Sequence, residues 1–179
     1  MIITLLANGF EEIEALTPVD ILRRAGLNVL TCSIGDREVF GAHGIKVVAD
    51  ICPDELDPTE VDMLILPGGM PGATNLDASP LTDTLIDAVL TNGGRLAAIC
   101  AAPLVLGRRG LLKGKRATCY PGFEDELVGA TATGEGVVTD ENITTAKGMG
   151  VALRFALELV RLTVGEDKAK EISAAIMEE

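Results

Sequence analysis

The stretch RLAAICAAPLVLGRRG, residues 95–110, places a cysteine where an apolar run gives way to a helical pattern. Residues 95–99 have the length and composition of a buried strand, and Pro103 can begin a helix because its missing N–H would have no partner there. Cys100 therefore lies on the turn between strand and helix. It is either a small apolar side chain of the core or a thiol that the turn holds out from the sheet for chemistry.

Short runs rich in Ile, Val, Leu or Thr recur along the chain, each with the length of a strand. Besides residues 95–99, they cover residues 2–7, 28–34, 62–67, 115–119 and 142–146. Amphipathic helical patterns lie between them, bounded by Gly, Pro, Asn or Asp. This alternation is typical of an α/β domain with a parallel sheet, and the lack of linkers or repeats predicts one domain over residues 1–179.

Two of the helical patterns carry clear start and stop signals. Thr17 is a good N-cap before Pro18, and Gly26 closes the pattern, so we predict a helix that begins at Thr17. Residues 79–94 repeat this arrangement, with Ser-Pro at the start and Gly-Gly at the end. The C-terminal residues 150–179 predict two more helices that meet at a glycine, the first of them apolar on the face that docks on the sheet.

Two segments interrupt the parallel pattern. Residues 37–51 predict a hairpin broken by glycines, either an insertion or an edge of the sheet. Residues 137–146 predict a second hairpin, whose latter half is one of the strands above.

Charge and hydropathy exclude two classes of partner. The chain has 15 Lys and Arg against 27 Asp and Glu, a net charge of −12, which opposes binding to phosphate groups, so no nucleic acid is expected. No apolar run approaches the roughly 20 residues of a spanning helix, so no membrane is expected either. The start, MIITLLANGFEE, lacks the basic segment of a signal peptide, and we expect a cytoplasmic location.

The four cysteines are widely spaced, and a cytoplasmic chain keeps them reduced. Without a C-x-x-C motif and with a single histidine, the sequence predicts no metal site. Cys32, within a strand, is interpreted as a core residue. Cys52 precedes a proline at the start of a loop. Cys119 follows a predicted strand and is a candidate second thiol of the site.

Ligands in an open α/β sheet bind beyond the carboxyl ends of the strands. The glycine loop PGGMPG (67–72) follows one strand there, and the N–H groups of Gly69 and Ala101 are candidates to hold a developing oxyanion. The acidic segment after the first strand offers Glu14. If its carboxyl turns inward, burial raises its pKa and it can reach Cys100; the alternative is an ordinary acidic helical turn that faces water.

Four segments, in this order and spacing, resemble the ThiJ/PfpI superfamily, nearest to the branch of the parkinsonism-associated deglycase. They are GFEEIEALTPVDILRRAG (9–26), LPGGMPGATNL (66–76), AAICAAP (97–103) and AKGMGVALRFALELV (146–160). The resemblance covers nearly the whole chain. It implies a flavodoxin-like (Rossmann-like) three-layer sandwich with a mainly parallel central sheet, helices on both faces, and a homodimer.

The resemblance also implies which residues act. The reactive cysteine of the family falls on Cys100, the carboxyl that hydrogen-bonds it falls on Glu14, and the backbone donors of the oxyanion pocket fall on Gly69 and Ala101. Members of the family act without a cofactor on α-oxoaldehydes such as methylglyoxal, or remove early glycation adducts. Others respond to oxidative stress, or are described as peptidases or chaperones.

The sequence departs from the family at one place. Many members carry a histidine just before a proline, after the strand that follows the helix beyond the reactive cysteine. Here TCYPG puts Tyr120 before Pro121. The Cys–His pair of a peptidase is therefore not visible. Tyr120 is a candidate substrate contact or a packing residue. His43, in the glycine-broken hairpin, is interpreted as a loop or edge residue.

Three functions follow as hypotheses. In a glyoxalase or deglycase, Cys100 attacks the aldehyde carbon and Glu14 shuttles a proton between adjacent carbons. In an oxidative-stress sensor or chaperone, Cys100 is oxidised to a sulfinic acid that Glu14 holds. A peptidase or amidase is the third hypothesis, and it needs a general base that the sequence does not offer.

Overall fold

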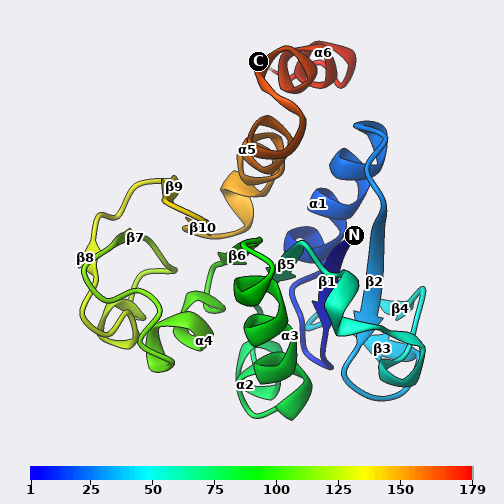
Figure 1. The fold of residues 1–179 in the computed structure, drawn as a ribbon, viewed down its shortest axis with the longest axis vertical. Helices are drawn as coiled ribbons and strands as arrows, with labels where there is room; N and C mark the ends of the chain where they lie inside the picture. Colours follow the sequence, from blue (N-terminus) through cyan, green and yellow to red (C-terminus); the bar gives the residue numbers. More distant parts are fainter. Residues whose placement is uncertain (179) are drawn as a thin grey trace.

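The computed structural model describes residues 1–178 and is built on a six-stranded sheet (Figure 1). In spatial order, the strands are β2 (Val29–Ser33), β1 (Ile2–Leu6), β5 (Met63–Leu66), β6 (Arg95–Ile99), β10 (Ile143–Ala146) and β9 (Val137–Asp140). Neighbouring strands are parallel except β10 and β9, which form the predicted second hairpin. The mainly parallel sheet confirms the predicted α/β fold.

Helices cover both faces of this sheet. One face carries α1 (Glu12–Arg24) and α5 (Ala152–Val164), with α6 (Glu166–Ala175) packed on α5; the other carries α2 (Gly72–Asp77), α3 (Pro80–Thr91) and α4 (Pro103–Arg108). Successive strand residues point to opposite faces. Met63 and Ile65 pack toward α1 and α5, whereas Leu64 and Leu66 pack toward α3 and α4. The strands are therefore apolar on both sides, which produces the three predicted layers.

The order of the strands creates a crevice at one end of the sheet. The chain leaves β1 toward β2 on one side and later returns to β5 on the other side of β1. Connections that diverge in this way open a crevice beyond the carboxyl ends of the strands, where ligands bind in such folds. The loops that follow β1, β5 and β6 all reach this end, and they carry the candidate site residues.

Shorter elements complete the fold. The predicted hairpin at residues 37–51 is an insertion with its own two-stranded sheet, β3 (Glu38–Phe40) and β4 (Lys46–Val48). Single 3-10 turns, η1 to η4, lie at Pro53–Glu55, Pro58–Glu60, Glu124–Glu126 and Met149–Val151.

The strand predicted at residues 115–119 lies outside the main sheet. Only β7 (Arg116–Ala117) is extended and paired, and its partner is the short strand β8 (Thr131–Ala132). The N–H of Thr118 donates instead to the hydroxyl of Thr145, at 2.9 Å. This side-chain bond ties the segment to β10 without extending the ladder.

The prediction that a helix begins at Thr17 is wrong. Helix α1 begins at Glu12, after Glu11 as its N-cap, and Pro18 lies inside it. Pro18 lacks an N–H, so it removes only the backbone bond to the carbonyl of Glu14, one turn earlier. The acidic residues of the first turn stabilise the N-terminal end. Glu14 thus faces the sheet from within a continuous helix.

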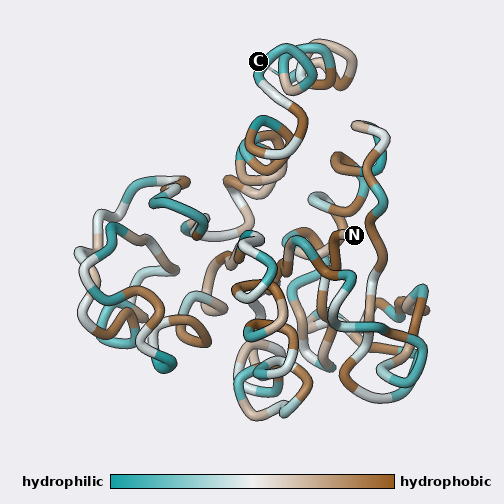
Figure 2. The backbone as a smooth tube through the Cα atoms, viewed as in Figure 1, coloured by the Kyte–Doolittle hydropathy of each residue, from teal (hydrophilic) through white to brown (hydrophobic). Residues whose placement is uncertain are grey.

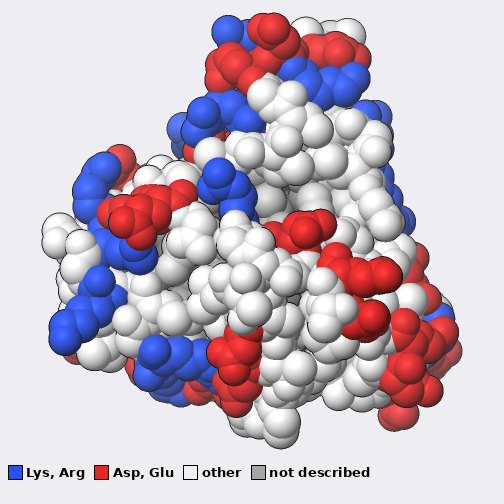
Figure 3. Space-filling view, viewed as in Figure 1, with Lys and Arg blue, Asp and Glu red and all other residues white. Residues whose placement is uncertain are grey.

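The surface is mixed in charge. On the face drawn in Figure 3, Lys and Arg form small separate groups that often adjoin Asp or Glu, with uncharged surface between them. Figure 2 shows hydrophobic residues along the strands and polar ones in many outer turns. Among the described residues, no helix has both the length and the apolar character needed to cross a membrane.

Phe155 of α5 provides a test of the packing. Its side chain is fully buried in the core between α5 and the sheet. We expect Phe155→Ala to lower the free energy of unfolding by about 3–5 kcal/mol, because a large cavity replaces the ring. Urea unfolding measures this change. The exposed Arg154→Ala on the same helix is the control, with a change within about 0.5 kcal/mol. A loss below about 1 kcal/mol for Phe155→Ala would contradict the packing described.

Candidate active site

Cys100 follows β6 directly and has a backbone φ of 64°, in the left-handed region that side chains rarely adopt. Two hydrogen bonds fix this turn. The Cys100 N–H donates to the carbonyl of Ala146 at 2.9 Å, and the Tyr120 N–H donates to the carbonyl of Cys100 at 2.8 Å. Helix α4 begins three residues later. The predicted strand, elbow and helix are therefore confirmed, and the elbow holds the thiol at the carboxyl end of the sheet.

Glu14 projects from α1 toward this elbow and is 1% exposed. Its Oε2 accepts a hydrogen bond from the N–H of Gly68 at 3.0 Å. The N–H of Glu11 donates to the carbonyl of the same glycine at 2.9 Å. Gly68 thus joins the start of α1 to the loop after β5. The alternative of an acidic turn that faces water does not hold for Glu14.

Burial raises the pKa of Glu14 to about 7, more than hydrogen bonds from Cys100 and Gly68 lower it. A carboxyl with this pKa is divided between its acid and its carboxylate at neutral pH. It can therefore give or accept a proton under ordinary conditions.

Two glycines let the loop after β5 pass between α1 and the elbow. A Cβ on Gly68 would lie 2.6 Å from Oε2 of Glu14 and 2.7 Å from Cβ of Cys100. A Cβ on Gly69, whose φ is +84°, would lie 2.4 Å from the backbone nitrogen of Glu11. Neither position has room for a side chain. The bare backbone of Gly68 thus lies against both the carboxyl and the thiol, which are direct neighbours.

The thiol is held in its protonated form. Burial and the Glu14 carboxylate raise the pKa of Cys100 to about 12, while the backbone N–H groups of Ala101 and Gly69 act in the opposite direction. A position before the start of a helix favours the thiolate, but burial and this carboxylate outweigh that effect here. The two N–H groups nevertheless face the sulfur, where the sequence predicted an oxyanion pocket.

These groups line a cavity of about 310 Å³. Its walls are formed by Glu11, Glu14, His43, Gly69, Met70, Cys100, Ala101, Tyr120, Phe123 and Met149. Tyr120, the candidate substrate contact, is half exposed at this cavity. His43 also lies here, although the sequence gave no reason to associate the β3–β4 loop with the thiol.

The remaining cysteines lie apart from the cavity. Cys119 does not line it: its side chain is 5% exposed in the core beside α4, and burial raises its pKa to about 11. The candidate role of Cys119 as a second thiol at the site is therefore wrong, because its side chain turns into the core. Cys32 is a core residue as predicted, and Cys52 is partly exposed at the start of η1.

Within residues 1–178, two groups of side chains have the donor atoms of a metal site. They are Glu11, Glu12 and His43, and Cys52, Asp54 and Glu55. In the first group, the imidazole and backbone of His43 already bind the Glu12 carboxylate. In the second, Arg37 and the backbone N–H of Cys52 bind Glu55. These contacts account for both clusters without a cation.

Known proteins resemble this chain in sequence and in fold. The model of the DJ-1/PfpI family matches residues 1–162. Protein DJ-1 homolog B of Arabidopsis thaliana is 38% identical over 175 residues, which cover 96% of this chain and 40% of that protein. The glutathione-independent glyoxalase DJR-1.2 of Caenorhabditis elegans is 33% identical, with coverage of 90% and 87%. The solved structure of oxidized Toxoplasma gondii DJ-1 matches with a TM-score of 0.94 at 33% identity, covering 98% and 97%.

The resemblance drawn from the four sequence segments is therefore confirmed. The chain spans less than half of the Arabidopsis relative but most of the nematode and Toxoplasma proteins.

The coupling between Glu14 and Cys100 gives a testable prediction. We expect Glu14→Gln to lower the pKa of Cys100 by about one unit or more, about tenfold more thiolate, because a neutral amide no longer repels the thiolate. The pH dependence of alkylation by iodoacetamide measures this. Cys52→Ser serves as the background, because Cys52 is the other partly exposed thiol. If alkylation of Cys100 showed the same pH dependence in Glu14→Gln as in the wild type, the coupling would be refuted.

Proposed function

Because the chain belongs to the DJ-1/PfpI family, we propose that it is a cysteine-dependent, cofactor-independent enzyme that acts on reactive α-oxoaldehydes or their early glycation adducts. One observation carries this proposal: a thiol lies beside a buried carboxyl whose pKa is about 7. The name of the nematode relative, a glutathione-independent glyoxalase, supports the same reaction class.

The first step is addition of the thiol to the aldehyde. The Glu14 carboxylate accepts the proton of Cys100 as the sulfur attacks the aldehyde carbon, so a free thiolate is not needed beforehand. The C=O bond becomes a C–O bond, and the oxygen takes the proton to give a hemithioacetal. The N–H groups of Gly69 and Ala101 stabilise the negative charge that develops on this oxygen.

The second step moves a proton between carbons. The Glu14 carboxylate removes the proton from C1, the carbon bonded to sulfur, and an enediolate forms as the C2 carbonyl accepts the electrons. Glu14 returns the proton to C2, the proton of the C1 hydroxyl passes to the C2 oxygen, and C1 becomes the carbonyl of a thioester. Water then cleaves the thioester, releasing a 2-hydroxy acid and the thiol. The sum is addition of water to the α-oxoaldehyde, with no external oxidant or reductant.

A single domain over residues 1–179, a homodimer and a cytoplasmic location belong to this proposal as well. They rest on the sequence pattern and on the family resemblance. Light scattering of the purified chain gives its mass in solution, with twice the 18.7 kDa of one chain as the expected result and the mass of one chain as the contrary one.

Oxidation of Cys100 is a second candidate function. The thiol reaches a cavity, and the half-protonated Glu14 beside it can donate a hydrogen bond to a sulfinate oxygen. A solved relative, the Toxoplasma protein, is described as oxidized. A redox sensor and an aldehyde enzyme use the same thiol, so the two functions do not exclude each other.

The proposed enzyme predicts a specific pattern of losses. With methylglyoxal as substrate, we expect Cys100→Ala to abolish lactate formation and Glu14→Gln to lower kcat about 10²–10⁴-fold, because no other group shuttles the proton. An enzymatic lactate assay measures both. Cys52→Ser, which alters a thiol remote from the cavity, keeps the wild-type rate. Equal rates of lactate formation in Cys100→Ala and the wild type would refute the proposal.

The sensor hypothesis predicts a different product. Mild peroxide treatment is expected to add two oxygen atoms to Cys100, because the hydrogen bond from Glu14 stabilises the sulfinate. Intact-mass and peptide analysis detect this adduct. In the Glu14→Gln variant, we expect most of Cys100 to be either less or more oxidised than the sulfinic acid. If Cys100 of the wild type carried no two-oxygen adduct, the sensor hypothesis would be rejected.

A further inference from the structure

His43 is the single histidine of the chain, and it lines the cavity that contains Cys100 and Glu14. It lies in the loop between β3 and β4. This loop is anchored beside the start of α1, where the N–H of Ala42 donates to the carbonyl of Phe10 at 2.8 Å. The inserted hairpin therefore delivers an imidazole to the site.

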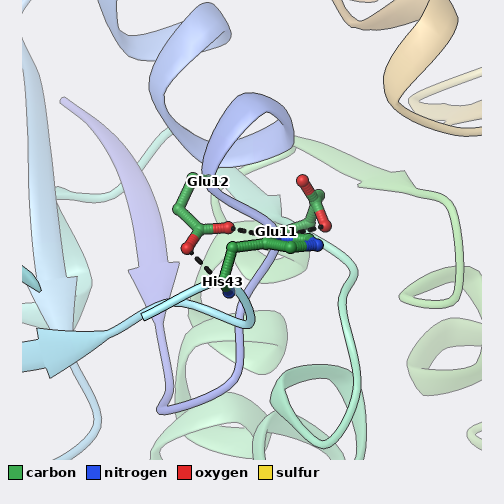
Figure 4. A group of neighbouring side chains, drawn as sticks. All are labelled: Glu11, Glu12 and His43. Atoms are coloured by element: carbon green, nitrogen blue, oxygen red, sulfur yellow. Dashed lines mark hydrogen bonds and ion pairs between the residues drawn. The ribbon is translucent and has the colours of Figure 1, made fainter. Parts of the chain in front are cut away.

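The buried carboxylate of Glu12 fixes the orientation of His43 (Figure 4). One oxygen of Glu12 lies 3.1 Å from Nδ1 of the ring, and the other accepts the backbone N–H of His43 at 2.9 Å. A Cβ on Gly41 would lie 2.2 Å from this carboxylate, so a glycine there makes the room it needs. Glu11 lies 3.5 Å from the same Nδ1. Both carboxylates therefore contact the ring at Nδ1.

These contacts leave the other ring nitrogen, Nε2, available. In Figure 4 it lies on the side of the ring away from Glu12, and among the described residues it has no hydrogen-bond partner. Nδ1 must carry a proton to pair with Glu12, and the negative carboxylates raise the pKa of His43. In the protonated ring both nitrogens carry a hydrogen, so Nε2 is then a proton donor. The titratable groups that face His43 from α1 and across the cavity are Glu11, Glu12, Glu14, Cys100 and Tyr120.

The proposed reaction needs such a donor. An α-oxoaldehyde has two adjacent oxygens, and the backbone N–H groups of Gly69 and Ala101 serve only the oxygen of the attacked carbon. Negative charge develops on the C2 oxygen when the enediolate forms. Apart from Cys100 and Glu14, the described side chains of the cavity that carry N–H or O–H are those of His43 and Tyr120. An imidazolium stabilises an enediolate better than a neutral phenol does.

We propose that His43, oriented by Glu12, is a further catalytic residue that donates a hydrogen bond from Nε2 to the C2 oxygen of the bound substrate. The proposal rests on the proposed function. Nε2 gives its proton to this oxygen as the enediol forms and regains one from the C1 hydroxyl as the thioester forms. Glu14 moves a proton from C1 to C2, and His43 moves one from oxygen to oxygen, so both residues return to their starting states.

The test is the pH dependence of kcat/KM for methylglyoxal. Activity requires ionised Glu14, so kcat/KM rises as the pH passes about 7. Activity also requires protonated His43, so kcat/KM falls as the pH passes the raised pKa of that residue. We expect His43→Gln to lower kcat/KM about 10²-fold and to remove the alkaline decline. Glu12→Gln moves the decline to lower pH. Lys46→Gln, on the same hairpin and paired with Glu38, leaves the profile unchanged.

A second measurement does not depend on activity. Because the chain has one histidine, its imidazole gives a single set of NMR signals whose titration reports the pKa of His43. Glu12→Gln is expected to lower this pKa toward the ordinary value for histidine, while Glu11 still raises it in part. The His43→Gln protein is expected to alkylate at Cys100 at the wild-type rate, which shows that the elbow is intact.

Several results would overturn the proposal. One is a His43→Gln enzyme within about twofold of the wild type. Another is loss of the alkaline decline in Tyr120→Phe but not in His43→Gln, which would make the phenol the donor. A titration that Glu12→Gln leaves unchanged would remove the orienting role. If Cys100→Ala forms lactate at the wild-type rate, the proposed function fails first and the role of His43 with it.

Discussion

The left-handed backbone of Cys100 is the constraint on which the site depends. A non-glycine residue with this conformation costs about 1–2 kcal/mol, so surrounding contacts must hold it. The carbonyl of Ala146 and the N–H of Tyr120 do so, from β10 and from the segment after β7. The turn lifts the sulfur out of the sheet, and the N–H groups of Ala101 and Gly69 face it.

The chemistry follows from placing a thiol and a carboxyl together in a buried place. Each group resists ionisation there, which raises the pKa of Glu14 to about 7 and that of Cys100 to about 12. At neutral pH the pair therefore holds its thiol proton until a substrate arrives. Reactivity then depends on transfer of that proton to Glu14 during attack, which spares the thiol from indiscriminate reactions with other electrophiles.

Much of the fold could be predicted from local patterns, and the elbow is the clearest case. A strand-length apolar run, a cysteine and a proline sufficed, because each signal is local. The start of α1 could not be predicted from the Thr-Pro signal, since Pro18 removes one backbone bond and the helix tolerates the loss. The pairing of residues 115–119 depends on which distant strand is nearby, which local composition does not encode.

The site was predicted in part for the same reason. Cys100, Gly69 and Ala101 follow strands directly, so topology brings them together. For Glu14 the residues left two alternatives open, an inward carboxyl and an acidic turn that faces water, and the family resemblance favoured the first. His43 was missed because its partner Glu12 lies 31 residues away in the sequence, and only the folded hairpin joins them. The burial of Glu12 would have pointed to His43 as its partner, but the sequence does not show that Glu12 is buried.

The central claim is that Cys100 bonds covalently to the aldehyde and that Glu14 carries the proton that completes the reaction. Native mass spectrometry of Glu14→Gln protein mixed with methylglyoxal keeps the reversible hemithioacetal intact and tests both halves at once. The sulfur can still attack in this variant, because loss of the carboxylate lowers the pKa of Cys100 and supplies more thiolate. The account predicts that one methylglyoxal unit accumulates on Cys100 in this variant and not in the wild type, which turns over. A variant that carries no adduct on Cys100, or that releases lactate as fast as the wild type, would contradict it.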